Sequence, residues 1–311
     1  MNKKLMVLAS AVLSAALTLQ AGTAGAASQP SSERSASSSS AANASNHAEA
    51  VYLASLPLLK SSSKLPAAIS YLNNNIYAVT PYRATLMILK LENIQKAALS
   101  SWEDKFSGSS IQRKLKEIYT PGAGMDKLAD SAGYPAIRTL LKSAGDSGYK
   151  LESAEGNIFP VIDYIKYRKY KMYVTPDIRD YISIMATESD LPSAKDDGLI
   201  IAWSDVASRT LSLECFITAY PRSNRITAAK TLYARYLSST FYGLNNTPLF
   251  HYDNLEMDLE AQKAYTALLA KHADATPFLE KLKGFMELLK DNGYKLDDAA
   301  KLYLSKEIPQ K

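Results

Sequence analysis

YRATLMILKLENIQKAALSSW, residues 82–102, spaces its apolar side chains as one face of a helix does: Leu86, Leu89 and Ile94 form the stripe, and Leu91 widens it. Residues at this spacing share a side of an α-helix and pack against a neighbouring element. LEAQKAYTALLAKH (259–272) and PFLEKLKGFMELLKD (277–291) show the same pattern, whereas alternating strand-like runs are scarce. The sequence therefore predicts an all-α fold, an array of antiparallel helix pairs arranged like a solenoid.

Threonine-proline pairs mark where several helices begin. Five of the thirteen prolines follow a threonine, and Thr80, Thr175 and Thr276 stand directly before amphipathic segments. A threonine at the N-cap accepts a hydrogen bond from a free amide, while proline at the first helical position loses no bond. We therefore expect helices to begin at these three threonines.

Two similar stretches predict helix ends. LLKSAGDSGYKLESA (140–154) and LLKDNGYKLDDAA (288–300) each read as a helix end, a glycine C-cap and an acidic start to a further helix. They are either an old duplication or one connector used twice. The folded domain is expected to span 51–311, and a subdivision near 120–157 is left open.

The N-terminus has the layout of a secretory signal. Lys3 and Lys4 precede the apolar run LMVLASAVLSAALTL (5–19), and Ala24-Gly25-Ala26 forms an A-x-A cleavage site. We expect a signal peptide at 1–26, a disordered Ser/Ala-rich spacer at 27–50, and no transmembrane segment after cleavage. The expected location is secreted or extracytoplasmic, in association with the cell wall.

The charge of the mature chain is small. Once Lys3 and Lys4 are removed, 34 basic residues face 31 acidic ones, a formal charge of +3. Nucleic-acid binding normally requires a stronger and more concentrated basic surface. We therefore expect no nucleic-acid partner.

LECFITAYPRSNRITAAKTLYARYL (213–237) predicts two helices joined by a polar turn. The run F-I-x-x-Y-P-x-S before an Ala-rich helix resembles the junction between tetratricopeptide repeats, over about residues 205–242. That resemblance implies stacked helix pairs with a concave binding face. Phe216 and Arg209 stand where that family usually has small residues, and no clean 34-residue period extends further.

MATESDLPSAKDDG (185–198) contains the strongest candidate for catalysis. Its Glu-Ser, Pro and Gly order resembles lytic transglycosylases, which implies that Glu188 would protonate a glycosidic oxygen of peptidoglycan. The spacing from serine to proline is one residue short, and the stretch that follows departs from that family. The alternative is a helix end that runs into a turn.

The sequence contains no motif for metal binding, nucleotide binding or catalysis by a serine nucleophile. The three histidines lack metal-ligand spacing, and HYDNLEMDLE (251–260) reads either as a cation site or as an acidic first helical turn, with the turn favoured. Nucleotide-binding glycine loops and a G-x-S-x-G elbow are absent from the sequence. We predict no cofactor and no metal.

Tyrosine is unusually abundant, with 20 residues against 7 phenylalanines. Its apolar ring and polar tip suit either packing between helices or a ligand groove. The favoured interpretation is packing, and Tyr167, Tyr170, Tyr233 and Tyr236 are the weak candidates for binding.

On an α-helix, the tyrosines of DYIKYRKYKMYVTPDIRDY (163–181) wind around half the surface, so this stretch predicts a helix end followed by a new helix.

The single cysteine, Cys215, has Leu213, Phe216 and Ile217 as neighbours, which favours burial; the alternative is a thiol available to another molecule.

Together these observations predict an exported, non-enzymatic α-helical protein that binds an envelope protein or a wall polymer. The alternative function is peptidoglycan cleavage through Glu188.

Overall fold

Threonine-proline pairs begin three helices, which confirms the expectation from the sequence. These helices are α3 (Pro81–Ser107), α7 (Pro176–Asp190) and α11 (Pro277–Asp291). The Thr80 hydroxyl accepts a hydrogen bond from the amide of Arg83 at 3.4 Å, and Thr276 accepts one from Leu279 at 3.2 Å. Thr175 caps α7 without such a bond. Local capping chemistry therefore determines where these helices start.

The computed structural model describes residues 45–272 and 275–309. These residues belong to one compact unit that begins at Ser45. The predicted signal peptide and most of the predicted spacer lie outside the described residues. The last part of that spacer, residues 45–50, is instead the start of a helix that runs to residue 55.

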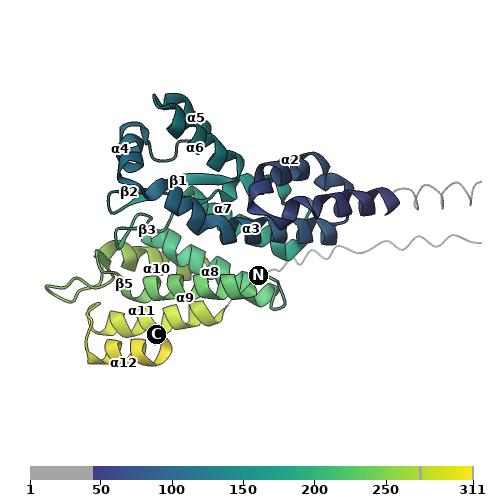
Figure 1. The fold of residues 1–311 in the computed structure, drawn as a ribbon. Helices are drawn as coiled ribbons and strands as arrows, with labels where there is room; N and C mark the ends of the chain where they lie inside the picture. Colours follow the sequence, from purple (N-terminus) through teal and green to yellow (C-terminus); the bar gives the residue numbers. More distant parts are fainter. Residues whose placement is uncertain (1–44, 273–274, 310–311) are drawn as a thin grey trace, which may run out of the picture. The chain divides into compact units, whose positions relative to one another are not determined.

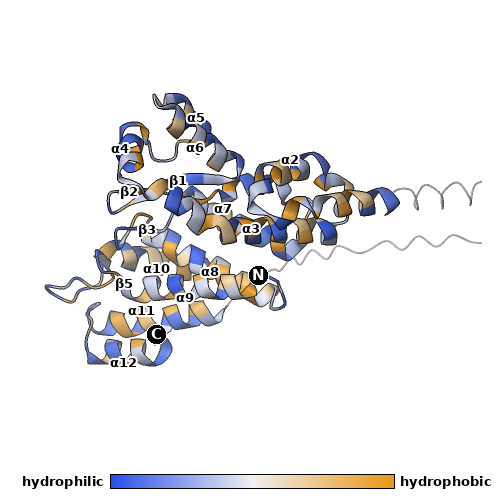
Figure 2. Ribbon diagram, in the orientation of Figure 1, coloured by the Kyte–Doolittle hydropathy of each residue, from blue (hydrophilic) through white to orange (hydrophobic). Residues whose placement is uncertain are grey.

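The N-terminal half surrounds α3 with short helices (Figure 1). Its elements before the first hairpin are η1 (Leu58–Lys60), η2 (Ser62–Lys64), α2 (Leu65–Asn75), η3 (Ile76–Ala78), α4 (Ser109–Ile118), α5 (Met125–Ser131) and α6 (Pro135–Asp146). The first core consists of buried apolar residues between 59 and 182, among them Leu72, Met87 and Leu91. Most helices in Figure 2 carry both hydrophobic and hydrophilic bands, as expected where one face is buried.

The first of the two similar stretches contains a hairpin, not the start of a helix. Strand β1 (Tyr149–Ala154) pairs antiparallel with β2 (Asn157–Ile162). Gly148 has a φ of 85°, so the glycine helix cap occurs as expected, but the chain then extends because Tyr149 and Leu151 alternate into the first core. Figure 1 shows this hairpin beside the helices. The second copy behaves as predicted: Gly293 has a φ of 70°, and α12 (Asp298–Glu307) follows.

The tyrosine-rich segment folds as a 3₁₀ helix, η4 (Tyr164–Tyr170), and not as the α-helix expected from the sequence. A 3₁₀ helix has three residues per turn, so positions three apart lie in one row. Tyr164, Tyr167 and Tyr170 therefore point together into the first core, and each is less than a tenth exposed. The tyrosines therefore do not wind around the helix surface as they would on an α-helix. The other part of the prediction, a new helix after Thr175, is confirmed by α7.

The C-terminal half consists of packed helices with two short hairpins. Its further elements are β3 (Ala194–Lys195), β4 (Gly198–Leu199), α8 (Trp203–Ala219), α9 (Ile226–Tyr242), β5 (Gly243–Leu244), β6 (Thr247–Pro248) and α10 (Leu259–Lys271). The second core contains buried apolar residues between 203 and 308, and a third core joins α7, α8 and α9 through Tyr181, Phe216 and Tyr236. Helices α8 and α9 pack along each other across the turn at 220–225, at the position where the sequence predicts a helix pair.

The described part of the chain is mostly α-helical, which confirms the broad fold class. Membership of a repeat family and a solenoid arrangement stay predictions. Within residues 45–272 and 275–309, the helices are too short or too polar to cross a bilayer.

Candidate functional site

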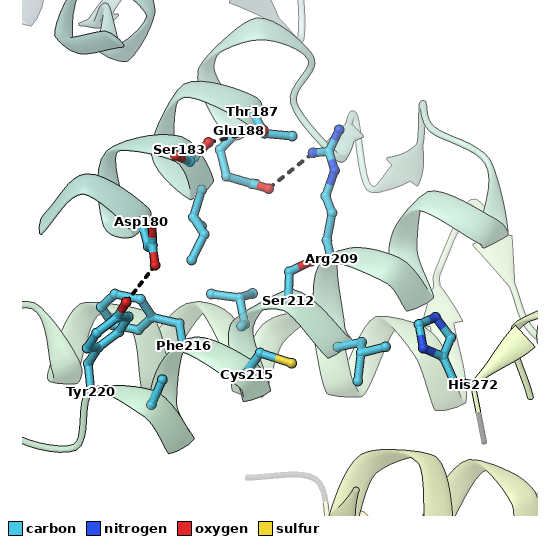
Figure 3. A pocket seen from close by; sticks show the side chains of 14 residues that line it. Asp180, Ser183, Thr187, Glu188, Arg209, Ser212, Cys215, Phe216, Tyr220 and His272 are labelled. Carbon is cyan, nitrogen blue, oxygen red and sulfur yellow. Dashed lines mark hydrogen bonds and ion pairs between the residues drawn. The ribbon is translucent and has the colours of Figure 1, made fainter. Parts of the chain in front are cut away.

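A groove of about 580 Å³ runs between α7 and α8 (Figure 3). On α7 the lining side chains recur at helical spacing, so one face of that helix faces the groove. On α8 the lining includes three consecutive residues, 211–213, and spreads over about half of the helix surface. The wall residues and one residue beyond the end of α10 are Asp180, Ser183, Ile184, Thr187, Glu188, Arg209, Leu211, Ser212, Leu213, Cys215, Phe216, Ala219, Tyr220 and His272. Small side chains on both helices leave the space between them open.

Glu188 and Arg209 face each other at one end of the groove (Figure 3). The guanidinium Nη1 lies 3.1 Å from Glu188 Oε1, and the Tyr236 hydroxyl donates to the same oxygen at 2.6 Å. Burial and the neighbouring Glu188 carboxylate raise the pKa of Tyr236 to about 12, so the phenol keeps its proton and acts as a donor. These three side chains therefore form a closed polar cluster.

Asp180 and Tyr220 form the other polar end. The Tyr220 hydroxyl donates to Asp180 Oδ2 at 2.7 Å, and Arg179 donates to Oδ1 at 3.2 Å. Figure 3 shows this pair at the opposite end of the groove from Glu188. The exposed lining of the groove is mainly apolar. Phe216, which is almost fully buried, packs against Tyr220 with ring centroids 5.3 Å apart.

Cys215 is exposed in this groove, so the predicted burial is wrong. Leu213 and Phe216 are buried, as the apolar neighbourhood suggested. On an α-helix each residue turns by about 100°, so Cys215 points about 160° away from Leu213 and about 100° away from Phe216. Apolar neighbours in sequence therefore did not indicate the direction of the thiol.

The structure separates the four candidate tyrosines into two pairs. Tyr167 and Tyr170 lie in the first core, where their hydroxyls donate to the side chains of Gln95 and Asn73. Tyr236 and the half-buried Tyr233 lie in the third core. Tyr167 and Tyr170 are thus almost fully buried, and Tyr236 reaches Glu188 through its hydroxyl.

Glu188 is the one catalytic candidate that lines the groove. Arg209 and Tyr236 both donate hydrogen bonds to Glu188 Oε1. Glu188 therefore links α7 to α8 and α9 at this end of the groove.

Sequence reasoning missed Arg209, Ser212 and Asp180 as groove residues. Arg209 had stood out only as a departure from the repeat pattern. The available signal was the polar face of α7, where Asp180, Thr187 and Glu188 recur at helical spacing. The face of α8 that completes the groove carries no comparable signal.

Groups of three or more metal-binding side chains are absent from residues 45–272 and 275–309. In the acidic stretch 251–260, α10 begins only at Leu259, with Asp258 as its N-cap, so most of the stretch precedes the helix and is not its first turn. Comparisons of the chain with models of known protein families, with curated proteins and with solved structures find no match.

Proposed function

We propose that the protein is an exported, non-enzymatic binding protein whose α7–α8 groove holds a protein or wall-polymer partner in the bacterial cell envelope. The signal-like N-terminus supports export. The groove is of the size that binding sites commonly have, roughly 300–1,000 Å³.

One observation carries the proposal: the charged side chains that α7 presents to the groove are each paired with a side chain of the facing wall. Glu188 bonds Arg209, and Asp180 bonds Tyr220, so the surface that remains open is largely apolar. When a partner covers open apolar surface, that surface is removed from water and the free energy of the complex falls. The arrangement suits binding better than proton transfer.

Cys215 allows a direct test, because it is the single cysteine of the chain and lies in the groove. The rate at which a maleimide alkylates Cys215 would be measured for the chain from Ala27, alone and after incubation with purified cell wall or with an envelope protein fraction. We expect a partner in the groove to slow the reaction at least about tenfold, which corresponds to about 1.4 kcal/mol.

Ser212→Trp is expected to fill the groove and abolish the protection. Thr231→Trp is the matched control: both residues are exposed in mid-helix, and both hydroxyls donate to the carbonyl four positions earlier, at 2.9 and 3.1 Å. Equal alkylation rates with and without wall and envelope proteins would contradict the proposal.

Peptidoglycan cleavage through Glu188 is the second candidate, supported by the position of this carboxylate in the groove. A zymogram of the mature chain beside Glu188→Gln tests it. A clearing band that the substitution abolishes would establish cleavage and overturn the binding proposal. We expect no band from either protein.

A further inference from the structure

The 3₁₀ geometry of η4 sorts its side chains into three rows, because positions three apart share one side of such a helix. The tyrosine row faces the first core, as described above. The two other rows, continued into the turn after η4, hold four basic residues, which we call the basic strip: Lys166, Arg168, Lys169 and Lys171. Three of the four are exposed, and Lys171 is half-buried. The 3₁₀ helix therefore separates basic side chains from aromatic ones.

The tyrosine row anchors the backbone beneath the basic strip. The Tyr164 hydroxyl donates to Glu92 of α3 at 2.7 Å, and the Tyr170 hydroxyl donates to Asn73 of α2 at 2.6 Å. The rings of successive tyrosines pack with centroids 5.4 and 6.0 Å apart. A surface that is ordered before it binds loses less conformational entropy on binding.

The basic strip keeps a positive charge after its own ion pairs are counted. Asp163 lies 4.0 Å from Lys166, and Asp190 lies 3.5 Å from Arg168. Within residues 45–272 and 275–309, the other two lysines of the strip have no carboxylate within 4.0 Å. Four basic side chains beside two carboxylates leave a charge of +2.

Two lysines of the strip repel each other. Burial and the neighbouring ammonium of Lys166 lower the pKa of Lys169, although Asp163 acts in the opposite direction. An anion between the two ammonium groups would relieve this repulsion. Lys166 donates one hydrogen bond, to the carbonyl of Gly145 at 3.0 Å, and an ammonium has three protons to donate. Donors therefore remain for an anionic ligand.

Burial of the tyrosine rings restricts the class of ligand. Nucleobases and sugar rings commonly bind by stacking on aromatic faces, but the three tyrosines of η4 are each less than a tenth exposed. A lipid surface is bound through an apolar face, whereas the row of Lys166 and Lys169 adds one exposed apolar side chain, Met172. The strip thus offers ionic contacts, which suit a chain of charged groups.

We propose that the basic strip binds a phosphate-bearing polymer of the cell wall. At about 2.0 Å per residue, the strip extends for about 10 Å and contacts a few successive charges of such a polymer. None of its residues lines the α7–α8 groove, so this is a second site, and it does not depend on what the groove holds.

Linear inorganic polyphosphate with a fluorescent end label is the probe, and its anisotropy measures binding to the chain from Ala27. The strip variant combines Lys169→Gln with Lys171→Gln. The control variant combines Lys230→Gln with Lys290→Gln, two exposed lysines of α9 and α11, and changes the net charge equally. Circular dichroism verifies that both variants are folded.

We expect the control variant to bind polyphosphate within about twofold of the unchanged protein, and the strip variant to bind at least about tenfold more weakly. The slope of log affinity against log salt should be smaller by about two in the strip variant. Purified wall should retain the unchanged protein better than the strip variant. Treatment of the wall with hydrofluoric acid, which cleaves phosphodiester-linked polymers, should remove that difference.

Other outcomes would overturn the proposal. Absence of polyphosphate binding, or equal weakening in the strip and control variants, would show that the strip is not a polymer site. Vesicles of phosphatidylglycerol and phosphatidylcholine that bind through the strip, while polyphosphate does not bind, would assign it to a lipid surface. Protection of Cys215 by wall, measured in the same samples, reports on the groove: protection without polyphosphate binding upholds the groove and overturns the strip.

Discussion

The Glu92 carboxylate and the Arg225 guanidinium lie 2.6 Å apart, although 133 positions separate them in the sequence. Glu92 belongs to α3 in the N-terminal half, and Arg225 is the N-cap of α9. Their side chains are 3% and 12% exposed. Tyr164 and Tyr181 donate to the other carboxylate oxygen at 2.7 and 2.8 Å, so the pair is part of a polar network that joins the two halves.

Removal of one partner of this ion pair should strongly destabilise the protein. Arg225→Ala removes the guanidinium from the buried Glu92 and leaves Lys96, 2.7 Å away, as its charged partner. The loss should therefore lie near the lower end of the range for a broken buried ion pair, about 3 kcal/mol. Urea unfolding of the unchanged protein and of Arg225→Ala measures the difference in unfolding free energy. Glu287→Ala, which breaks an exposed pair with Lys283, is the control and should cost less than about 0.5 kcal/mol. Similar losses for both variants would show that the buried pair has no special role.

Stability should fall in acid because of Glu92. Burial raises the pKa of Glu92, but Arg225 and Lys96 together with hydrogen bonds outweigh burial, so the pKa lies below its ordinary value of 4.5. The contribution of the carboxylate is therefore complete above pH 4.5 and is lost as the pH falls below that value. Urea midpoints measured as a function of pH should fall less steeply for Glu92→Gln than for the unchanged protein. Parallel curves for the two proteins would contradict this assignment.

Gly148 should not tolerate a side chain. Its φ is 85°, and an added Cβ would lie 2.1 Å from Gln95 Nε2, which is fixed by a hydrogen bond to the carbonyl of Ser147. Gly148→Ala combines a conformational cost of about 1–2 kcal/mol with this steric clash. Gly156→Ala has a similar φ of 74° and no atom within 4 Å, so it should show the conformational cost alone. Equal unfolding free energies for the two variants would exclude the clash.

Cys215 should react in the folded state. Its exposure on α8 predicts that a thiol reagent modifies one equivalent without denaturant. Cys215→Ser should change the unfolding free energy by less than about 0.5 kcal/mol, as is typical of surface positions. Titration with a chromogenic disulfide measures the reaction. Modification that requires denaturant would show that the thiol is buried.

The sequence predicted the helical character of the protein because that information is local. A threonine followed by a proline marks a helix start, and apolar side chains every three or four residues indicate which face of the helix is buried. The hairpin β1–β2 was also visible in principle: Glu155 and Gly156, both with positive φ, form a two-residue turn between segments of alternating burial. The groove gave a weaker signal, since only the polar face of α7 marked it.

Export signals, helix starts and the predominance of α-helix were thus inferred from the sequence alone, and the helix starts and the fold class are found in the structure. The direction of Cys215, the row of buried tyrosines in η4 and the meeting of Glu92 with Arg225 depend on tertiary structure. The physical reason is that capping and periodicity act within a few residues, whereas burial depends on which helices pack against each other. The groove exists because the faces of two successive helices, α7 and α8, meet without closing, and neither helix alone encodes that arrangement.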